Sequence, residues 1–214
     1  MDKTRLFYFQ NQKRKKSSYK INSILNLQQI LFLILVIFFS FNRLNNSTPI
    51  INITIEGIGD QQFINESFSD SIYEVYINGI KNDSCKSKCH LPNENNNYNN
   101  ITLIFNNTKL NDYNKMFKHL TTIRRIDFSN FNNSAINDME GMFEGCSGLE
   151  QINFLNFDTS NILSMHSLFK GCSSLRSIDL SNLNLLLVTN ISEMFFGCSS
   201  LSSINFGTNF FLPF

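Results

Sequence analysis

A repeat with a period of 26 residues constrains this chain more than any other feature of its sequence. The phrase Leu168-Phe169-Lys170-Gly171-Cys172-Ser173-Ser174-Leu175 recurs in closely similar form at residues 142–149 and 194–201. A fixed period in this range is the signature of stacked repeats. The same interval separates the members of two columns, Phe117, Phe143, Phe169 and Phe195, and Cys146, Cys172 and Cys198.

Apolar residues recur at the same spacing in the rest of the repeat. Three columns follow the L-x-x-L-x-L pattern of a leucine-rich repeat: Ile123/Leu149/Leu175/Leu201, Ile126/Ile152/Ile178/Ile204 and Phe128/Phe154/Leu180/Phe206. One repeat cannot bury these side chains alone, so successive turns bury them against each other, with strands about 4.8 Å apart. We therefore predict an α/β fold, a leucine-rich-repeat solenoid with a parallel sheet of short strands, over residues 113–214.

The cysteine column allows two interpretations. Three thiols in register could bind a metal or form disulfides. Alternatively, each is a small apolar residue buried in its turn, because free cysteine is among the most buried residue types and Leu120 occupies the position in the first copy. We favour the buried interpretation, and we assign the phenylalanine column to the repeat core as well.

The N-terminus combines a basic cluster with an apolar stretch. Residues 1–42 carry seven Lys/Arg against Asp2, whereas the remainder carries eleven against sixteen Asp/Glu. The apolar core, residues 30–39, has the length of a signal-peptide core, and residues 21–42 are long enough to span a bilayer. The small residues of a cleavage site are missing after it, so we favour an uncleaved signal anchor at 21–42. It would follow a basic cytoplasmic tail at 1–20, with the body outside the cytoplasm.

Residues 43–112 are predicted to form a β-rich cap on the first repeat. Alternating apolar and polar residues indicate strands at 51–55, 72–77 and 101–105, and Asn78-Gly79 indicates a hairpin turn. The glycines of Gly57-Ile58-Gly59 are interpreted as an ordinary turn. Cys85 and Cys89, next to His90, could contribute to a metal site, but no second cluster completes a ligand set for zinc. A local disulfide between them is the favoured prediction.

The repeat resembles a known family, the 26-residue-repeat surface proteins, also called BspA-like leucine-rich repeats. The resemblance rests on the M-F-x-G-C-S-x-L phrase, on residues 156–161 and on Ser181-Asn182. It implies a surface-exposed or secreted protein used in adhesion and recognition, and it carries no catalytic site. The first copy departs from the phrase, with His119-Leu120 in place of Gly-Cys.

If the apolar strand positions face inward, the residues between them face outward. Such a polar face can bind a peptide or glycan through many hydrogen bonds, although any solvated sheet face has similar residues. The candidate binding face comprises Arg125, Asp127, Gln151, Asn153, Ser177, Asp179, Ser181, Ser203 and Asn205.

Asparagines that head N-x-S/T sequences are candidate N-glycosylation sites if the chain enters a secretory pathway. An Asn-rich chain also produces many such sequences by accident. They are Asn45, Asn46, Asn52, Asn65, Asn82, Asn100, Asn106, Asn132 and Asn190.

Catalytic motifs and phosphate-binding loops are missing from the sequence, so we expect no enzyme activity, no cofactor and no metal. The acidic body would repel phosphates, so no nucleic-acid partner is expected. The sequence predicts a cell-surface or secreted protein that recognises a protein or glycan ligand and contacts the membrane through residues 21–42. The alternative is a membrane-tethered intracellular scaffold for protein–protein interactions.

Overall fold

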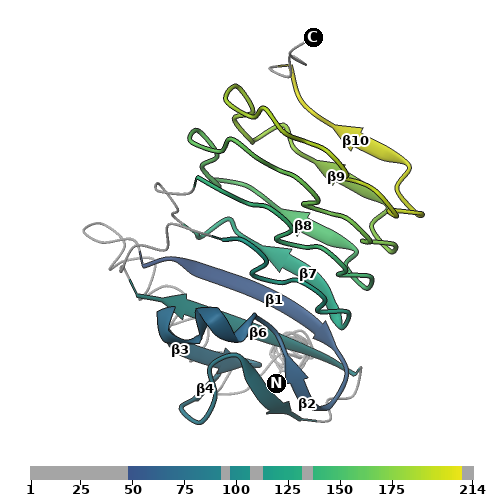
Figure 1. Cartoon of the computed structure of the whole chain (residues 1–214). Helices are drawn as coiled ribbons and strands as arrows, with labels where there is room; N and C mark the ends of the chain where they lie inside the picture. Colours follow the sequence, from purple (N-terminus) through teal and green to yellow (C-terminus); the bar gives the residue numbers. More distant parts are fainter. Residues whose placement is uncertain (1–47, 93–96, 107–112, 132–136, 209–214) are drawn as a thin grey trace, which may run out of the picture. The chain divides into compact units, whose positions relative to one another are not determined.

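The structure is a computed structural model that describes residues 48–92, 97–106, 113–131 and 137–208 (Figure 1). These residues lie in one compact unit, Asn45–Phe214, which includes both the predicted cap and the repeats. The predicted basic tail at 1–20 and the predicted anchor at 21–42 fall outside the described residues.

The cap and the first two repeats share one six-stranded sheet with the order β4-β3-β6-β1-β7-β8. Strand β1 pairs antiparallel with β6 on one side and with β7 on the other, and β7 pairs parallel with β8. The cap is therefore continuous with the repeats at the level of the backbone. The strands are β1 (Ile50–Glu56), β3 (Ile72–Ile77), β4 (Ile80–Asn82), β6 (Tyr98–Phe105), β7 (Ile123–Asp127) and β8 (Gln151–Asn153).

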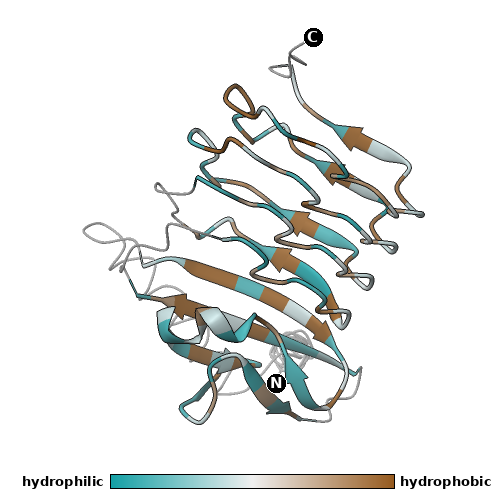
Figure 2. Cartoon of the chain, in the orientation of Figure 1, coloured by the Kyte–Doolittle hydropathy of each residue, from teal (hydrophilic) through white to brown (hydrophobic). Residues whose placement is uncertain are grey.

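Strands β1, β3 and β6 form where the apolar and polar residues alternate, as the sequence predicts (Figure 2). In β1 the side chains of Ile51, Ile53 and Ile55 are buried, because successive residues of a strand point to opposite faces. The β3–β4 hairpin turns at Asn78 (φ 50°) and Gly79 (φ 82°), a conformation that Asn-Gly adopts readily.

A small second layer covers the inner face of the cap. It consists of the antiparallel pair β2 (Gly59–Gln62) and β5 (Lys88–Leu91), with the 3-10 helix η2 (Glu66–Ser71) between them in the chain. Asn65 caps this helix by accepting the N–H of Ser67 on its side chain. Phe63, Phe68 and Leu91 are buried there, so the layer completes the hydrophobic core of the cap.

The repeats stack through aromatic rings. The rings of Phe117, Phe143, Phe169 and Phe195 are nearly parallel, with centroids 5.4–5.6 Å apart and interplanar angles of 3–6°. The third and fourth repeats carry β9 (Ser177–Asp179) and β10 (Ser203–Asn205), which pair in parallel. One hydrophobic core extends from the cap strands to the last of these rings.

The predicted α/β leucine-rich-repeat solenoid is wrong. The described residues are mostly strands and turns, and the helix they contain is the 3-10 helix η2 of the cap, not a helix in the repeats. The described strands also fail to form one continuous parallel sheet, because β7–β8 and β9–β10 belong to different sheets.

The backbone of residues 139–146 explains why no α-helix forms there. The N–H of Phe143 donates to the carbonyl oxygen of Leu168 in the next repeat (3.0 Å), whereas a helix would direct it to the residue four positions earlier. Gly141 (φ 57°) and Gly145 (φ 72°) interrupt the helical path at regular intervals. The segment thus exchanges helical hydrogen bonds for bonds between repeats.

The membrane prediction is also corrected. Within the described residues, no helix combines the length and the apolar character that crossing a bilayer requires. The predicted transmembrane helix and the single-pass location at the cell membrane are therefore not supported. The segment that prompted them, residues 21–42, lies outside the described residues.

Candidate functional site

A polar face runs across both the cap and the repeats. We define the outer sheet face as the side chains on the sheet surface opposite the core. In the ladder, Thr54 of β1 lies between Asn100 of β6 and Arg125 of β7, and Arg125 is followed by Gln151 of β8. The pair β9–β10 repeats the pattern, with Ser177 opposite Ser203. The outer sheet face comprises Asn52, Thr54, Asn100, Thr102, Arg125, Asp127, Gln151, Asn153, Ser177, Asp179, Ser203 and Asn205.

Side chains on this face bond to one another across the strands. Thr54 Oγ1 donates to Asn100 Oδ1 (3.1 Å), and Thr102 Oγ1 donates to Asn52 Oδ1 (2.8 Å). These two pairs are cross-strand neighbours in the antiparallel ladder of β1 and β6. The cap half of the outer sheet face is thus held in a fixed arrangement.

One column of the candidate face also shapes the backbone; its members are Asp127, Asn153, Asp179 and Asn205. Asp127 Oδ1 accepts the N–H of Ser129 and Asp179 Oδ1 accepts the N–H of Ser181, both at 2.8 Å. A side chain that accepts the N–H two residues later forms an Asx turn, which ends the strand. Asn153 and Asn205 accept the N–H two residues later in the same way. Each residue of this column therefore ends its strand in an Asx turn and also contributes to the polar surface.

Hydrogen bonds from Ser181, from both its side chain and its backbone, lower the pKa of Asp179, and the amide of Asn205 contributes less. The carboxylate form is favoured because it accepts all of these bonds. Asp127 similarly accepts a bond from Asn153 Nδ2 at 3.0 Å. The neighbouring outward column, at Arg125, Gln151, Ser177 and Ser203, consists of exposed side chains.

An ion pair links the cap to the first repeat at one end of the face. Arg124 Nε donates to Glu56 Oε2 at 2.6 Å, and Arg124 also donates to the carbonyl oxygen of Thr121. Tyr98, opposite Glu56 in the ladder, has an exposed ring. The positions equivalent to Arg124 in the next two repeats are Glu150 and Arg176, so the charges alternate along this edge.

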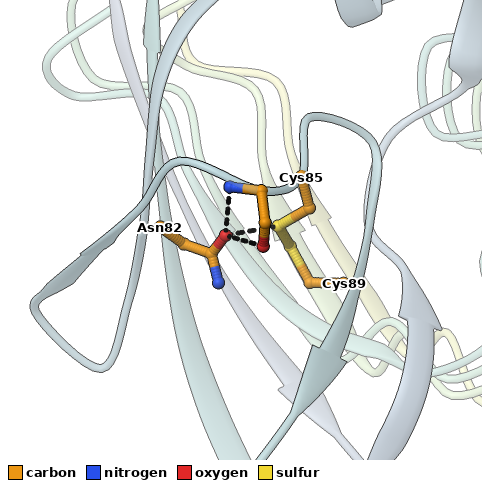
Figure 3. The surroundings of a disulfide bond; sticks show 4 residues. Asn82, Cys85 and Cys89 are labelled. Atoms are coloured by element: carbon orange, nitrogen blue, oxygen red, sulfur yellow. Dashed lines mark hydrogen bonds between the residues drawn. A yellow bond between two sulfur atoms is a disulfide. The ribbon is translucent and has the colours of Figure 1, made fainter.

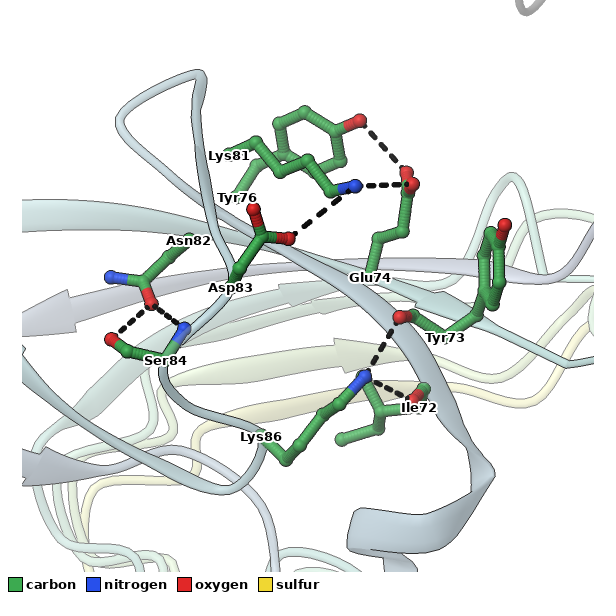
Figure 4. A network of polar contacts seen from close by, with 9 residues as sticks. All are labelled: Ile72, Tyr73, Glu74, Tyr76, Lys81, Asn82, Asp83, Ser84 and Lys86. Atoms are coloured by element: carbon green, nitrogen blue, oxygen red, sulfur yellow. Dashed lines mark hydrogen bonds and ion pairs between the residues drawn. The ribbon is translucent and has the colours of Figure 1, made fainter.

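A second polar cluster lies on the β3–β4 hairpin (Figure 4). Glu74 accepts a hydrogen bond from the hydroxyl of Tyr76 (2.8 Å) and pairs with Lys81 (2.9 Å). Burial, reinforced by Glu74, raises the pKa of Tyr76 to about 12. Lys86 donates to the carbonyl oxygens of Ile72 and Tyr73, both at 2.7 Å, and so attaches the following loop to β3.

Cys85 and Cys89 form a disulfide in that loop, with Cα atoms 5.5 Å apart (Figure 3). Asn82 Oδ1 accepts the N–H and the hydroxyl of Ser84 and lies 3.3 Å from Cys85 Sγ. The two sulfurs are joined to each other, as the favoured sequence prediction has it, and so are not free thiolates. His90 contacts Asp60 instead (2.9 Å), and the hydrogen bond between them, together with the charge of Lys88, lowers the pKa of Asp60.

The candidate glycosylation sites fall into two structural classes. Asn52 and Asn100 are in strands β1 and β6, on the outer sheet face. In Asn65, Asn82 and Asn190, the side chain accepts both the N–H and the hydroxyl of the serine two residues later. Asn106 follows β6, whereas Asn45, Asn46 and Asn132 lie outside the described residues.

The predicted repeat-core columns lie at the centre of the stack. Phe117, Phe143 and Phe169 are fully buried, as are Cys146 and Cys172. Phe195 and Cys198, in the last described repeat, are partly exposed and pack against the same core. Three of the four phenylalanines and two of the three free thiols are therefore enclosed by neighbouring turns.

Four cap residues on the outer sheet face were missed by the sequence analysis: Asn52, Thr54, Asn100 and Thr102. A signal was present, because both pairs occur in the same short phrase, Asn-Ile-Thr, with the isoleucine in the core. The alternation predicts which side chains leave the core. It does not reveal that β1 pairs with β7 and brings these residues into register with Arg125 and Asp127.

The comparison with protein families covers the repeats and the last strand of the cap. A model described as "Mycoplasma protein of unknown function, DUF285" matches residues 93–208, more than half of the chain. No curated protein and no solved structure matches this chain. The narrower assignment to the BspA-like surface proteins is not among the matches. By its repeats, the chain belongs to the DUF285 family.

Proposed function

We propose that this chain is a non-enzymatic recognition protein that binds a protein or glycan partner through its outer sheet face. We further propose that it is a cell-surface or secreted protein of the BspA-like type. The observation that carries the proposal is the register of the ladder, which aligns polar residues of β6, β1, β7 and β8 in one row.

The chemistry of this row suits a ligand with many hydrogen-bonding groups. Arg125 and Gln151 are exposed; Arg125 projects from β7, which is paired with β1 on one side and β8 on the other, and Gln151 projects from β8, which is paired with β7. Acidic and basic side chains alternate nearby, so the face does not select strongly for an anion or a cation. A rigid array of donors and acceptors loses little conformational entropy on binding, which favours an extended peptide or glycan.

The disulfide supports a location outside the cytosol. Disulfides persist in oxidising environments, whereas cytosolic thiols are kept reduced. Trapping thiols with an alkylating agent in intact cells, followed by mass spectrometry, measures the state of Cys85 and Cys89. An oxidised pair supports export, and a reduced pair favours the intracellular scaffold.

Binding is tested with the full chain on arrays of glycans and of extracellular proteins. We expect at least one ligand whose signal falls about tenfold or more in the variant Arg125→Ala/Gln151→Ala, because the substitutions remove charge-assisted and amide hydrogen bonds from the face. The control, Glu66→Ala/Asp70→Ala, changes two exposed residues in or beside η2. If no arrayed ligand distinguishes the face variant from the control, the proposal is wrong.

A further inference from the structure

An exposed tyrosine and a glutamate adjoin the cap half of the outer sheet face. Tyr98 of β6 lies opposite Glu56 of β1, and two residues along these strands Asn100 lies opposite Thr54. Residues two apart in a strand share a face, so all four side chains point to the same side. Opposed side chains are about 5 Å apart and those two residues apart about 7 Å, close to the size of one sugar ring. We call these four residues the tyrosine square.

Tyr98 supplies the apolar part of the square. Its side chain is 46% exposed, although β6 lies between β3 and β1 in the sheet. A tyrosine ring offers a large contact area and has few rotatable bonds, so little conformational entropy is lost when a ligand packs on it. The C–H groups on one side of a pyranose form an apolar surface that fits such a ring.

The other side chains of the square offer both a donor and an acceptor. Thr54 Oγ1 donates to Asn100 Oδ1, which leaves Asn100 Nδ2 as a donor without a hydrogen bond to the described residues. Arg124 contacts Glu56 through Oε2, so Oε1 has no partner in the same part of the chain. A hydroxyl group both donates and accepts, so neighbouring hydroxyls of a sugar can use the amide and the carboxylate together.

The backbone under the square is held by a buried side chain. Asn99, between the two β6 residues of the square, is fully buried. Its Nδ2 donates to the carbonyl oxygen of Gly57 (3.0 Å), and its Oδ1 accepts a bond from Asn78 Nδ2 (2.8 Å). These bonds join the start of β6 to the end of β1 and to the β3–β4 hairpin. The square is therefore ordered before a ligand arrives, which lowers the entropic cost of binding.

The surroundings of the square favour a neutral saccharide over a peptide strand. Strands β6, β1 and β7 are each paired on both sides, so their backbone groups are used within the sheet (Figure 1). A peptide that binds as an added strand needs a free sheet edge, whereas a saccharide is recognised through side chains. The nearby charges also balance, since Glu56 pairs with Arg124, and Arg125 lies two residues before Asp127.

We propose that the tyrosine square binds one ring of a neutral saccharide, stacked on Tyr98 with its hydroxyls bonded to Glu56 and Asn100. The proposal rests on the proposed function, because it concerns the same face, and it selects a glycan rather than a protein as the ligand. Arg125 lies opposite Thr54 on the next strand, in position to contact a second sugar unit.

The test is saturation-transfer NMR, followed by titration calorimetry, with a panel of neutral methyl hexosides, pentosides, N-acetylhexosaminides and their disaccharides. The full chain is produced in bacteria without N-glycosylation, because a glycan on Asn100 would cover the square. We expect binding of at least one panel member, with a dissociation constant about tenfold higher in Tyr98→Ala, because the stacking ring is lost. Tyr98→Phe keeps the ring and should stay within about twofold of the wild type.

The matched control is Tyr73→Ala, which removes a tyrosine that is 61% exposed on β3, outside the square, and should leave the affinity unchanged. Circular dichroism verifies that each variant is folded. The proposal is overturned if no panel member binds, if Tyr98→Ala binds as tightly as the wild type, or if Tyr73→Ala loses as much affinity.

The ligand arrays described above separate this proposal from the proposed function. A protein ligand that is lost in Arg125→Ala/Gln151→Ala but retained in Tyr98→Ala would refute the saccharide site and leave recognition through the outer sheet face standing. If neither the arrays nor the saccharide panel yields a ligand, both proposals are wrong.

Discussion

The thiol of Cys172 donates to the carbonyl oxygen of Phe143, one repeat earlier, across 3.2 Å. The same contact joins Cys146 to Phe117 (2.9 Å) and Cys198 to Phe169 (3.0 Å). Each cysteine therefore donates to a carbonyl oxygen in the preceding turn. The recurring cysteine is a structural feature of the stack, and its chemistry is suppressed by its position.

The rate at which each repeat cysteine is labelled should fall as its burial increases. Burial raises the pKa of Cys146 to about 12 and raises that of Cys172 as well, and the half-buried Cys198 is affected in the same direction. Since the thiolate is the reactive form, Cys146 and Cys172 should resist maleimide at pH 8. We expect the less buried Cys198 to react at least about tenfold faster than the other two, measured by peptide mass spectrometry. Equal rates at all three sites would contradict this account.

Gly145 should tolerate alanine less well than Gly171 does. Both have positive φ values, 72° and 75°, so a side chain at either costs about 1–2 kcal/mol. At Gly145 an added Cβ would also overlap the His119 ring, whereas at Gly171 its nearest neighbour is 3.5 Å away, an ordinary contact distance. Urea unfolding should show the larger loss for Gly145→Ala. Adding His119→Gly should remove most of the difference, and a loss that remains unchanged would refute the steric explanation.

Acid sensitivity should depend on Asp179. Its pKa is lowered in the folded state, so its contribution to stability is present above the unfolded value of about 3.9 and is lost as the pH falls through the folded value. An asparagine at this position would keep a side-chain oxygen that can accept the N–H of Ser181, just as Asn153 and Asn205 accept the N–H two residues after them. The variant Asp179→Asn should match the wild type near pH 7 and lose less stability between pH 4 and pH 2 in thermal melts. If the melting temperatures of the two proteins changed identically with pH, the Asx turn at residue 179 would not depend on the charge of the carboxylate.

The disulfide should stabilise the fold modestly. It closes a short loop between Cys85 and Cys89, four residues apart, and a loop of this size gives about 2 kcal/mol on the chain-entropy model. The variant Cys85→Ser/Cys89→Ser should unfold at a correspondingly lower urea concentration than the oxidised wild type. Reduction of the wild type should reproduce the shift, and reduction should leave the double variant unchanged.

The sequence predicts local structure well where one face of a strand is buried. Ile51, Ile53 and Ile55 alternate with polar residues, and the strand they predict is β1. The same pattern contains no information about partners, so the pairing of Ile53 with Ile126 could not be anticipated. The repeat columns likewise identify which side chains stack, because burial at a fixed period requires it.

The prediction of helices in the repeats was wrong because two patterns of backbone hydrogen bonds, one within a helix and one between repeats, fit the same spacing of apolar residues. Phe143 could have donated its N–H within a helix, but it donates to Leu168 instead. The glycines at 141 and 145 were evidence for the second scheme, since their positive φ values are incompatible with a helix. Asp127 was expected to face outward. Its Asx turn could not be predicted, because the turn depends on where the Ser129 N–H lies and the repeat period contains no information about that position.

The ion pair between Arg124 and Glu56 bears on how the chain finds its register while folding. Phe117, Phe143, Phe169 and Phe195 stack with the same geometry, so these four rings do not distinguish one repeat from the next. Docking of the second repeat by mistake would place Glu150 against Glu56, two like charges, where the first repeat offers Arg124. Glu56 therefore meets an opposite charge in the native register and a like charge after a slip of one whole repeat, so the charge of this residue disfavours that slip.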